Sequence, residues 1–530
     1  METLTTIMSK IKNFTEEQWK WILATFIAGV LAYFTMMSEG LVNNYDGIWH
    51  PSNFIAGDWE ISLGRGLQRY ADRVRFGIVS DAFNSMITIF LFSIGINIIM
   101  KCFDVKRKLL RILASVILIA NPIVCDILSY SYMSPNFGLA FVFAVLSFTV
   151  LCGETCTKKK IIVNVIVSSM VFAISMAFYQ SYISVTALLM LLLCIKKISA
   201  DESNKQVICY AGKCMGTCVL GGAIYWLITK ALLFRAGIEL ASYRGASGVS
   251  PVKILINLPL SLKNAFVSFY YYLFTYKAYS NLEFINLLLI LITLFELLVI
   301  VSVSLMAAKK HIIKGVICFL LSLFIPVASG FVILIAVGNS MSDLMSYGYI
   351  MSLAMIPALI DEDEVPQTVA VRSVTVVRRG VTLILAAFLW FQLSAAVNDQ
   401  IALKEGKTAT VTLVQNIVTT LQQEDCLEDY NNIAFVGRPA DNFLFSKSTA
   451  YLMANNYARF GCFSTDARNS RVTYDGVLRS FLGVSINLCG DEDYNEIKAR
   501  DFVASMPQFP LEGSIVNYNG TIVVKVSDCY

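Results

Sequence analysis

The chain has 530 residues, of which 56% are hydrophobic and 15% are charged, and its formal net charge is +4. Because soluble domains carry about 25% charged residues, this composition excludes an ordinary soluble protein and indicates an integral membrane protein. The only histidines are His50 and His311, so a metal site built from several histidines is also excluded.

Residues 1–20 are predicted to form a cytoplasmic amphipathic segment, and residues 21–397 a membrane domain. In the membrane domain, apolar runs recur at about the 20-residue length that a helix needs to cross a bilayer. We therefore predict an α-helical integral membrane protein with about 11 transmembrane helices. The spans are expected near residues 21–37, 83–100, 112–128, 137–151, 161–178, 183–195, 207–234, 284–306, 312–337, 344–360 and 381–397.

A polar loop, residues 38–80, separates the first two spans. Apolar and aromatic side chains recur at helical spacing in its second half, which predicts a helix lying in the membrane interface over 58–76. The loop concentrates charge, with Asp46, Asp58, Glu60, Arg65, Arg69, Asp72, Arg73 and Arg75. A mixed-charge loop beside a large hydrophobic body is where binding or chemistry is expected.

Basic residues mark the side of the membrane on which each loop lies. They gather in loops on the side of the N-terminus: Lys101, Lys106, Arg107, Lys108, Arg111, Lys158, Lys159, Lys160, Lys196, Lys197, Lys309, Lys310, Arg378 and Arg379. Because cytoplasmic loops carry the excess of Lys and Arg, that side is predicted to be cytoplasmic. The 38–80 loop, the 235–280 segment with its expected half-helices, and all residues after 397 are then outside.

Residues 398–530 form a polar tail with 11 Lys and Arg against 16 Asp and Glu, a net charge of −5. Its pattern predicts a helix over 408–423, a helix over 451–460, and strands at NNIAFVGRP and TIVVKV. We expect a small extracytoplasmic α/β domain. Four cysteines in the tail would suit disulfides in an oxidising compartment, with the pairing left open: Cys426, Cys462, Cys489 and Cys529.

Asp46 lies a few residues beyond the first span, in the sequence NNYDGIWH. A carboxylate there can reach a substrate whose reactive group lies at the outer membrane surface, and one carboxylate is enough to act as a general base in a sugar transfer with inversion. The alternative is a solvated turn former, because Asp-Gly is a common turn.

Arginines further along the loop are candidates for binding a lipid-linked phosphate, because a guanidinium can bind phosphate through two hydrogen bonds. The alternative is that they contact anionic lipid headgroups. The candidates for the phosphate are Arg65, Arg69, Arg73, Arg235 and Arg244, and the candidates for other substrate contacts are Tyr45, His50, Asp58, Glu60, Tyr179 and Gln180. Tyr179 and Gln180 could equally be ordinary interfacial residues.

Several short motifs together resemble the polytopic, serotype-converting glucosyltransferases that modify O-antigen. They are the acid after the first span (Asp46), the Gly64-Arg65 pair, NPIV in the third span (121–124), and YQSYIS (179–184). Many such enzymes have two adjacent acids in the first outer loop, whereas Gly47 follows Asp46 here. The second acid then passes to Asp58 or Glu60, or is absent.

The resemblance implies a GT-C-like glycosyltransferase of a bacterial cytoplasmic (inner) membrane. It also implies a polyprenyl-phosphate sugar donor such as undecaprenyl-phosphate glucose, a polysaccharide acceptor such as O-antigen, and Asp46 as the catalytic acid residue of the outer loop. A flippase and a donor-making glucosyltransferase are further candidate partners, and nucleic acid is not expected. No cofactor is implied with certainty, and a divalent metal stays open.

Two other functions remain as alternatives. A flippase or transporter of lipid-linked sugar would need ionisable residues inside the spans and internal repeats. A surface polysaccharide polymerase would share the donor chemistry and a large outer loop.

Overall fold

The computed structural model describes residues 2–43, 46–50, 52–153, 157–242, 251–274, 283–335, 341–360, 370–424, 432–444 and 467–528. Predictions that concern Tyr45, Arg244 and the helix over 451–460 therefore lie outside the described residues. The same is true of the tail cysteines other than Cys489, so the disulfides stay a prediction.

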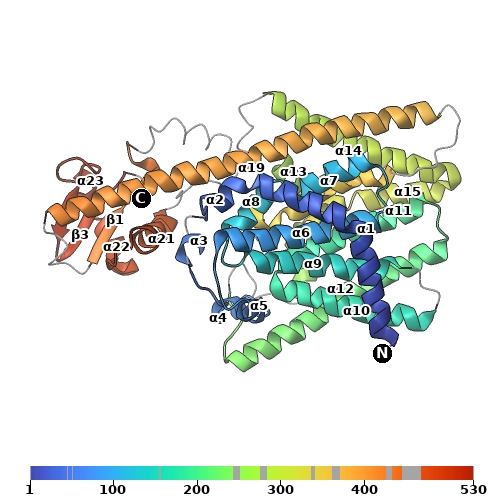
Figure 1. The fold of residues 1–530 in the computed structure, drawn as a ribbon, viewed down its shortest axis with the longest axis horizontal. Coiled ribbons are helices and arrows are strands. Elements are labelled where there is room, and N and C mark those ends of the chain that lie inside the picture. Colours follow the sequence, from blue (N-terminus) through green and yellow to red (C-terminus); the bar gives the residue numbers. More distant parts are fainter. Residues whose placement is uncertain are drawn as a thin grey trace.

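The first part of the chain is a bundle of helices with the polar loop at one end (Figure 1). Up to residue 129 its helices are α1 (Glu2–Ala32), α2 (Phe34–Ser38), α3 (Asp46–Trp49), α4 (Asp58–Ser62), α5 (Gln68–Val74), α6 (Asp81–Cys102), α7 (Lys108–Ile119) and α8 (Pro122–Ser129). Next come α9 (Ser134–Cys152), α10 (Lys158–Phe178), η1 (Gln180–Tyr182), α11 (Ile183–Ser199) and α12 (Asn204–Ala236). The bundle continues with α13 (Pro251–Phe274), α14 (Glu283–Lys310), α15 (Ile312–Ser322), α16 (Ile325–Ser329), α17 (Val332–Ile335), η4 (Asp343–Met345), α18 (Tyr347–Met355) and η5 (Ile356–Ile360).

In the described residues, nine helices are long and apolar enough to cross a membrane, and two shorter apolar helices accompany them, Ile312–Ser322 and Tyr347–Ile360. Long apolar helices are what the sequence predicted for a membrane protein. One of the nine, Val252–Leu273, lies where we expected only half-helices at the surface. Its single proline, Pro259, is accommodated inside α13.

The third predicted span is two helices, α7 and α8, separated at Asn121 and Pro122. Pro122 has no N–H and suits the first position of a helix. The Asn121 side chain caps α8 by accepting from the N–H of Ile123 (3.1 Å) and of Val124 (3.2 Å). The Tyr33 hydroxyl, at the break between α1 and α2, donates to the Asn121 carbonyl at 2.7 Å. The break between α1 and α2 is thus hydrogen-bonded to the break between α7 and α8.

The last predicted span and the predicted tail helix form one continuous helix, α19 (Ala370–Gln423). Its 54 residues make it about 80 Å long at 1.5 Å per residue. Figure 1 shows α19 lying along the bundle and extending well past the loop end. Gln400 fastens it to the first helices, because its side-chain NH₂ donates to the carbonyl of Ala32 (2.9 Å) and its oxygen accepts from the N–H of Met36 (3.1 Å).

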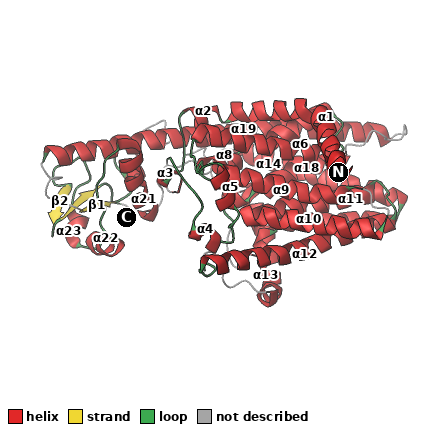
Figure 2. Ribbon diagram, turned by 60° about the horizontal axis from the view of Figure 1, so that its bottom comes forward, coloured by secondary structure: helices red, strands yellow, loops and turns green. Residues whose placement is uncertain are grey.

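After α19 the chain forms a small unit around a three-stranded sheet in the order β1-β3-β2 (Figure 2). Strand β1 (Asn432–Val436) pairs parallel to β3 (Thr521–Lys525), and β2 (Ile515–Tyr518) pairs antiparallel to β3. Strands β1 and β3 lie where the sequence predicted them. The accompanying helices are η6 (Pro439–Asp441), α21 (Ala467–Val477), α22 (Asp491–Lys498), α23 (Asp501–Ser505) and the π-helical turn η7 (Leu478–Leu482).

Candidate functional site

The Asp46 carboxylate is carried by α3, a helix of only four residues. Asn43 stabilises its first turn: the side-chain oxygen accepts from the N–H of Gly47 at 2.8 Å, and the side-chain NH₂ donates to the carbonyl of Ser129 at 3.1 Å. A Cβ at Gly47 would lie 2.6 Å from that Ser129 carbonyl oxygen. The close approach of α3 to the end of α8 therefore explains why a second acid does not follow Asp46.

Asp46 keeps exposed surface, so a substrate can reach its carboxylate. Partial burial raises the pKa of this carboxyl above its ordinary value. The negative charge of Glu60 raises the pKa further, and the positive charge of Arg65 lowers it. The pKa of Asp46 thus depends on one acid and one arginine from the same loop, and perturbed pKa values are common at functional sites.

Glu60, on α4, is buried with 8% of its surface exposed. Its carboxylate accepts from the N–H of Gly57 at 2.7 Å, which holds it at the start of the helix. Asp58, the other candidate for a second acid, is exposed and forms an ion pair with Arg69 at 2.8 Å. Of the two candidates, Glu60 is the acid whose charge acts on Asp46.

Arg65 is positioned by Tyr179, the residue that follows α10, and by Gln180 of η1, whose side chain also bonds Tyr225 on α12. Its Nε donates to the side-chain oxygen of Gln180 at 3.3 Å, and its guanidinium lies 4.8 Å from the centre of the Tyr179 ring. The Gln180 NH₂ donates to the carbonyl of Leu63 (2.6 Å) and to the hydroxyl of Tyr225 (2.9 Å). The structure therefore brings together Arg65, Tyr179 and Gln180, which the sequence had proposed separately.

Gly64 is required by this arrangement for two reasons. Its φ of +77° is in the left-handed region, which favours glycine, and a Cβ would lie 2.3 Å from the Tyr225 hydroxyl oxygen. Tyr225 was missed by sequence reasoning, because it lies within a long apolar helix, α12. The only signal was a phenol hydroxyl inside a span, a group that requires a hydrogen-bond partner when buried.

Arg69 was predicted to bind the donor phosphate, but its hydrogen bonds are made within the loop. Besides its pair with Asp58, its Nε donates to the carbonyl of Ala56 at 2.9 Å. Arg73 and Arg235 are both exposed, with Arg235 in the last turn of α12. Their role in phosphate binding stays a prediction.

Asp72, which is fully buried, holds the loop on the bundle. Its carboxylate accepts from the N–H of Ala56, from the guanidinium of Arg75 and from the side chain of Asn136, each at 2.9 Å. The Arg75 guanidinium also donates to the carbonyl of Tyr132 at 2.8 Å. A buried carboxylate is stable only with such partners, so Asp72 is a structural anchor of the loop.

His50 packs between two aromatic rings, with ring centres 4.6 Å from Phe54 and 4.7 Å from Tyr132. Its burial lowers the pKa of the imidazole below its ordinary value. A lowered pKa favours the neutral form of the imidazole. Its proposed contact with substrate stays a prediction.

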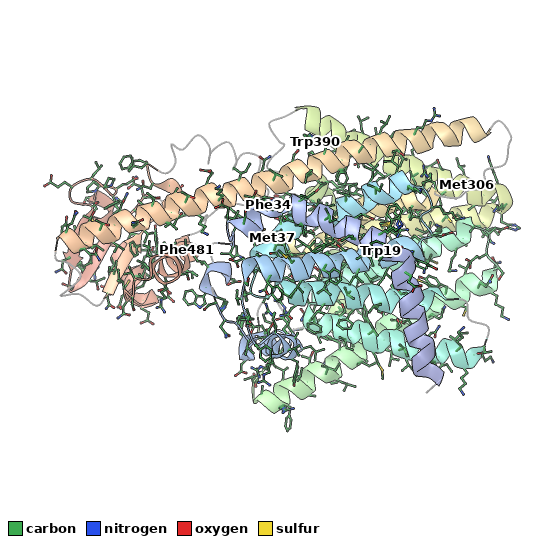
Figure 3. The ribbon with its side chains drawn as sticks, in the orientation of Figure 1. Trp19, Phe34, Met37, Met306, Trp390 and Phe481 are labelled. Atoms are coloured by element: carbon green, nitrogen blue, oxygen red, sulfur yellow. The ribbon has the colours of Figure 1, made fainter. Side chains whose placement is uncertain are left out.

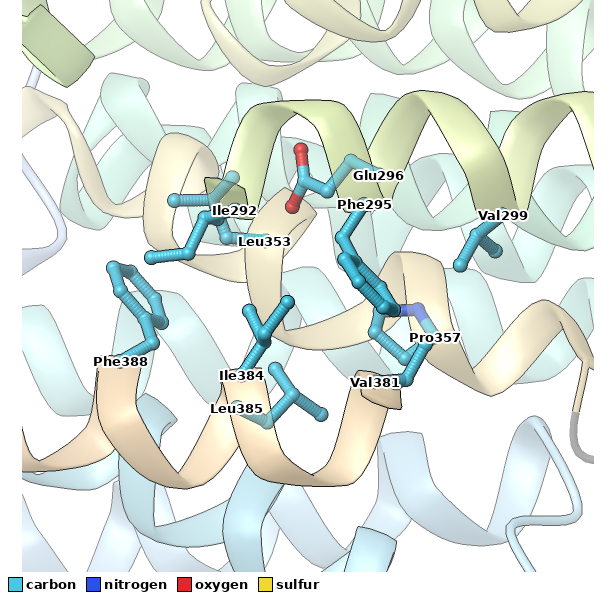
Figure 4. Close-up of a pocket in the computed structure, with 10 residues that line it drawn as sticks. All are labelled: Ile292, Phe295, Glu296, Val299, Leu353, Pro357, Val381, Ile384, Leu385 and Phe388. Atoms are coloured by element: carbon cyan, nitrogen blue, oxygen red, sulfur yellow. The ribbon is translucent and has the colours of Figure 1, made fainter. Parts of the chain in front are cut away.

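A pocket inside the bundle is distinct from this site and lies between α14, α18, η5 and α19 (Figure 4). Its walls are apolar except for Glu296, whose Oε1 is buried without a hydrogen-bond partner in the described residues. Sequence reasoning missed this carboxyl in the middle of an apolar run. Across the part of the chain that the structure describes, no group of three or more His, Cys, Asp or Glu side chains could hold a metal ion.

The family model described as Glucosyl transferase GtrII matches residues 40–356, which include the 38–80 loop almost entirely and the helices from α3 to α18. No curated protein and no solved structure matches the chain. The matched region is more than half of the 530 residues, and the protein therefore belongs to the GtrII glucosyl transferase family.

Proposed function

We propose that the protein transfers glucose from a polyprenyl-phosphate donor to a surface polysaccharide such as O-antigen, on the outer face of a bacterial inner membrane. One observation carries the proposal: Asp46 is reachable from solvent, and the charges of Glu60 and Arg65 both act on its carboxyl. A general base and a cation that binds the donor phosphate are the two groups that this reaction needs, and we assign these roles to Asp46 and Arg65.

In the proposed reaction, the Asp46 carboxylate takes the proton of an acceptor hydroxyl. The hydroxyl oxygen forms a bond with the anomeric carbon of the donor, and the bond from that carbon to the phosphate oxygen breaks with inversion. Arg65 stabilises the negative charge that develops on the leaving polyprenyl phosphate. A phosphate leaves as an anion near pH 7, so a second catalytic acid is unnecessary.

The proposed topology follows from the basic residues that mark the cytoplasmic side. The loop, the C-terminal part of α19 and the small sheet unit are then outside, where a flipped donor and a lipid-linked polysaccharide would be available. A flippase and the enzyme that makes the donor are the partners that such a reaction requires.

The test is Asp46→Asn in cells that make the surface polysaccharide, with Asp104→Asn as the matched control. Asp104 lies at the opposite end of the bundle with a φ of +47°, a conformation that asparagine tolerates well. We expect mass spectrometry to find the glucose modification lost in Asp46→Asn and retained in the control, with equal protein in the membrane. A normal level of modification in Asp46→Asn would overturn the catalytic role.

One observation favours the second candidate function, a flippase of lipid-linked sugar. Glu296 is an ionisable residue inside a long apolar helix, and such residues often mark transport pathways. Purified protein in vesicles would flip a polyprenyl-phosphate sugar without any acceptor if this function were correct. The glucosyltransferase requires the acceptor and releases polyprenyl phosphate.

A further inference from the structure

The tail unit contacts the helix that carries Asp46. The Ser480 hydroxyl, on η7, donates to the backbone carbonyl of Ile48 on α3 at 3.1 Å. Gly476, near the end of α21, lies so close to Ile48 that an added Cβ would be 2.7 Å, 2.8 Å and 3.0 Å from three atoms of that side chain. Ile48 itself is 1% exposed. The two elements are therefore in direct contact, although more than 400 residues separate them in sequence.

A helix of four residues needs such outside support. None of its carbonyls can be satisfied by a following helical turn, and so short a helix is unstable by itself. Asn43 and Ser129 hold one side of α3, and Ser480 supplies a donor to the carbonyl of Ile48. Asp46 and Trp49, three residues apart and thus on one face of the turn, are left exposed.

The tail is also fastened next to the start of the loop. Lys407, on α19, donates to the carbonyls of Glu39 (3.1 Å) and Gly40 (3.2 Å), and its ammonium lies 4.4 Å from the centre of the Phe481 ring. Lys404 forms an ion pair with Glu39 at 3.0 Å. Figure 3 labels Phe481 in the tail and Phe34 and Met37 at the loop end of the bundle. These contacts fix the distance between η7 and the beginning of the loop.

We infer that α21 and η7 are a positioning element of the active site: Gly476 and Ser480 hold α3 against the bundle and so aim the Asp46 carboxylate at the acceptor. The inference rests on the proposed function for the role of Asp46. It assigns a role in catalysis to a part of the chain that lies outside residues 40–356, the region matched by the family model. Gly476 and Ser480 act through Ile48 and touch no substrate.

The first experiment compares one substitution at two glycines of the tail in the full-length protein. In Gly476→Ala the new methyl displaces Ile48, whose branched side chain is stiff and tightly packed. We expect the kcat of glucosyl transfer to fall about tenfold, with the KM for the donor unchanged, because small misplacements of a catalytic group are costly. In Gly490→Ala the nearest atom to the new methyl is Asp493 Oδ2 at 3.5 Å, and kcat is expected to stay at the wild-type value.

The second experiment separates positioning from a general loss of folding. Ile48→Ala removes the three atoms that the new methyl would meet, and by itself it loosens α3. The double variant Ile48→Ala/Gly476→Ala should have a higher kcat than either single variant, because the added methyl then fills part of the space. Limited proteolysis of α21 in both single variants shows whether the tail stays folded, and a lower kcat with an intact tail is then assigned to positioning.

Two results would overturn the inference. One is a wild-type kcat in Gly476→Ala. The other is a loss of kcat in the double variant that equals the product of the fold-losses of the two single variants. Neither result would affect the role of Asp46, which is decided by Asp46→Asn alone. Conversely, full transfer by Asp46→Asn would remove the proposed function, whatever the tail variants do.

Discussion

Two carboxyl groups in this protein have opposite surroundings. Asp46, in the loop, keeps exposed surface and feels the charges of Glu60 and Arg65. Glu296, in the pocket between α14, α18, η5 and α19, is surrounded by apolar side chains, and its Oε1 has no partner in the described residues. A buried acid is thus not by itself a catalytic site: Asp46 is exposed and has Arg65 among the charges that act on it, whereas Glu296 lies in an apolar pocket.

Replacing each carboxylate with its isosteric amide is expected to have very different effects at the two positions. Asp46→Asn should lower kcat by about 10²- to 10⁴-fold, the usual contribution of a general base. Glu296→Gln should change kcat by less than about twofold, as expected of a residue without contact to the reacting groups. Transfer of radiolabelled glucose by purified protein measures both. A large loss in Glu296→Gln would mean that the pocket takes part in the reaction.

The loop can also be disrupted by a substitution that leaves every charged residue in place. Gly64→Ala places a methyl 2.3 Å from the Tyr225 hydroxyl oxygen at a residue with a φ of +77°, so Arg65 must move away from Gln180. We expect kcat/KM for the donor to fall by about 10- to 100-fold, because phosphate stabilisation depends on position. Gly222→Ala on the same helix as Tyr225 is the matched control, since nothing lies within 4 Å of its Cβ. Equal activity of the two variants would contradict the assigned role of Gly64.

A substitution of Glu296 in the pocket is expected to change the stability of the protein rather than its turnover rate. Glu296→Leu removes a buried oxygen without a partner, and we expect the free energy of unfolding to rise by about 1–3 kcal/mol. Glu512→Leu, at an exposed tail position, should change it by less than about 0.5 kcal/mol. Thermal unfolding in detergent compares the two. A loss of stability in Glu296→Leu would show that the carboxyl has a stabilising partner after all.

The smallest effects are expected in the pH dependence of transfer, which reports the charges around Asp46. The active form is the carboxylate, so the rate falls as the pH decreases through the pKa of Asp46. Because Arg65 lowers that pKa and Glu60 raises it, Arg65→Ala should move the acid limb to higher pH, and Glu60→Gln should move it to lower pH. Each shift is expected to be about one pH unit or less. If the acid limb moved in the same direction along the pH axis in both variants, this electrostatic arrangement would be excluded.

The residues of the candidate site stand out locally in the sequence, and their catalytic roles stay predictions. Asp46, Arg65 and Gln180 are polar residues beside long apolar runs, and Gly64 precedes an arginine in a loop. Residue type and place in the chain were enough to select them. The helical, membrane character of the bundle followed in the same way from composition.

Contacts between distant parts of the chain could not be predicted from the sequence. Tyr225 reaches the loop from the middle of an apolar helix, and Gly476 meets Ile48 from another part of the chain. The phenol of Tyr225 signals that a hydrogen-bond partner is needed but not which one, and nothing in the sequence around Gly476 signals Ile48. The pairing of Arg69 with Asp58 was missed for a related reason: a pattern of charges does not say which of several arginines is already bound to an acid.

Because α19 is continuous, its length sets both the distance of the tail from the membrane domain and the rotation of the tail about the helix axis. At 3.6 residues per turn, one residue inserted between Gln400 and Lys404 would rotate everything that follows by about 100°. Gln400 would stay on the first helices, while Lys404 and Lys407 would turn away from Glu39 and carry Ser480 off Ile48. An insertion of seven residues would nearly restore the angle but displace the tail by about 10 Å. Only one length of α19 between Gln400 and Lys404 therefore keeps all of these contacts together.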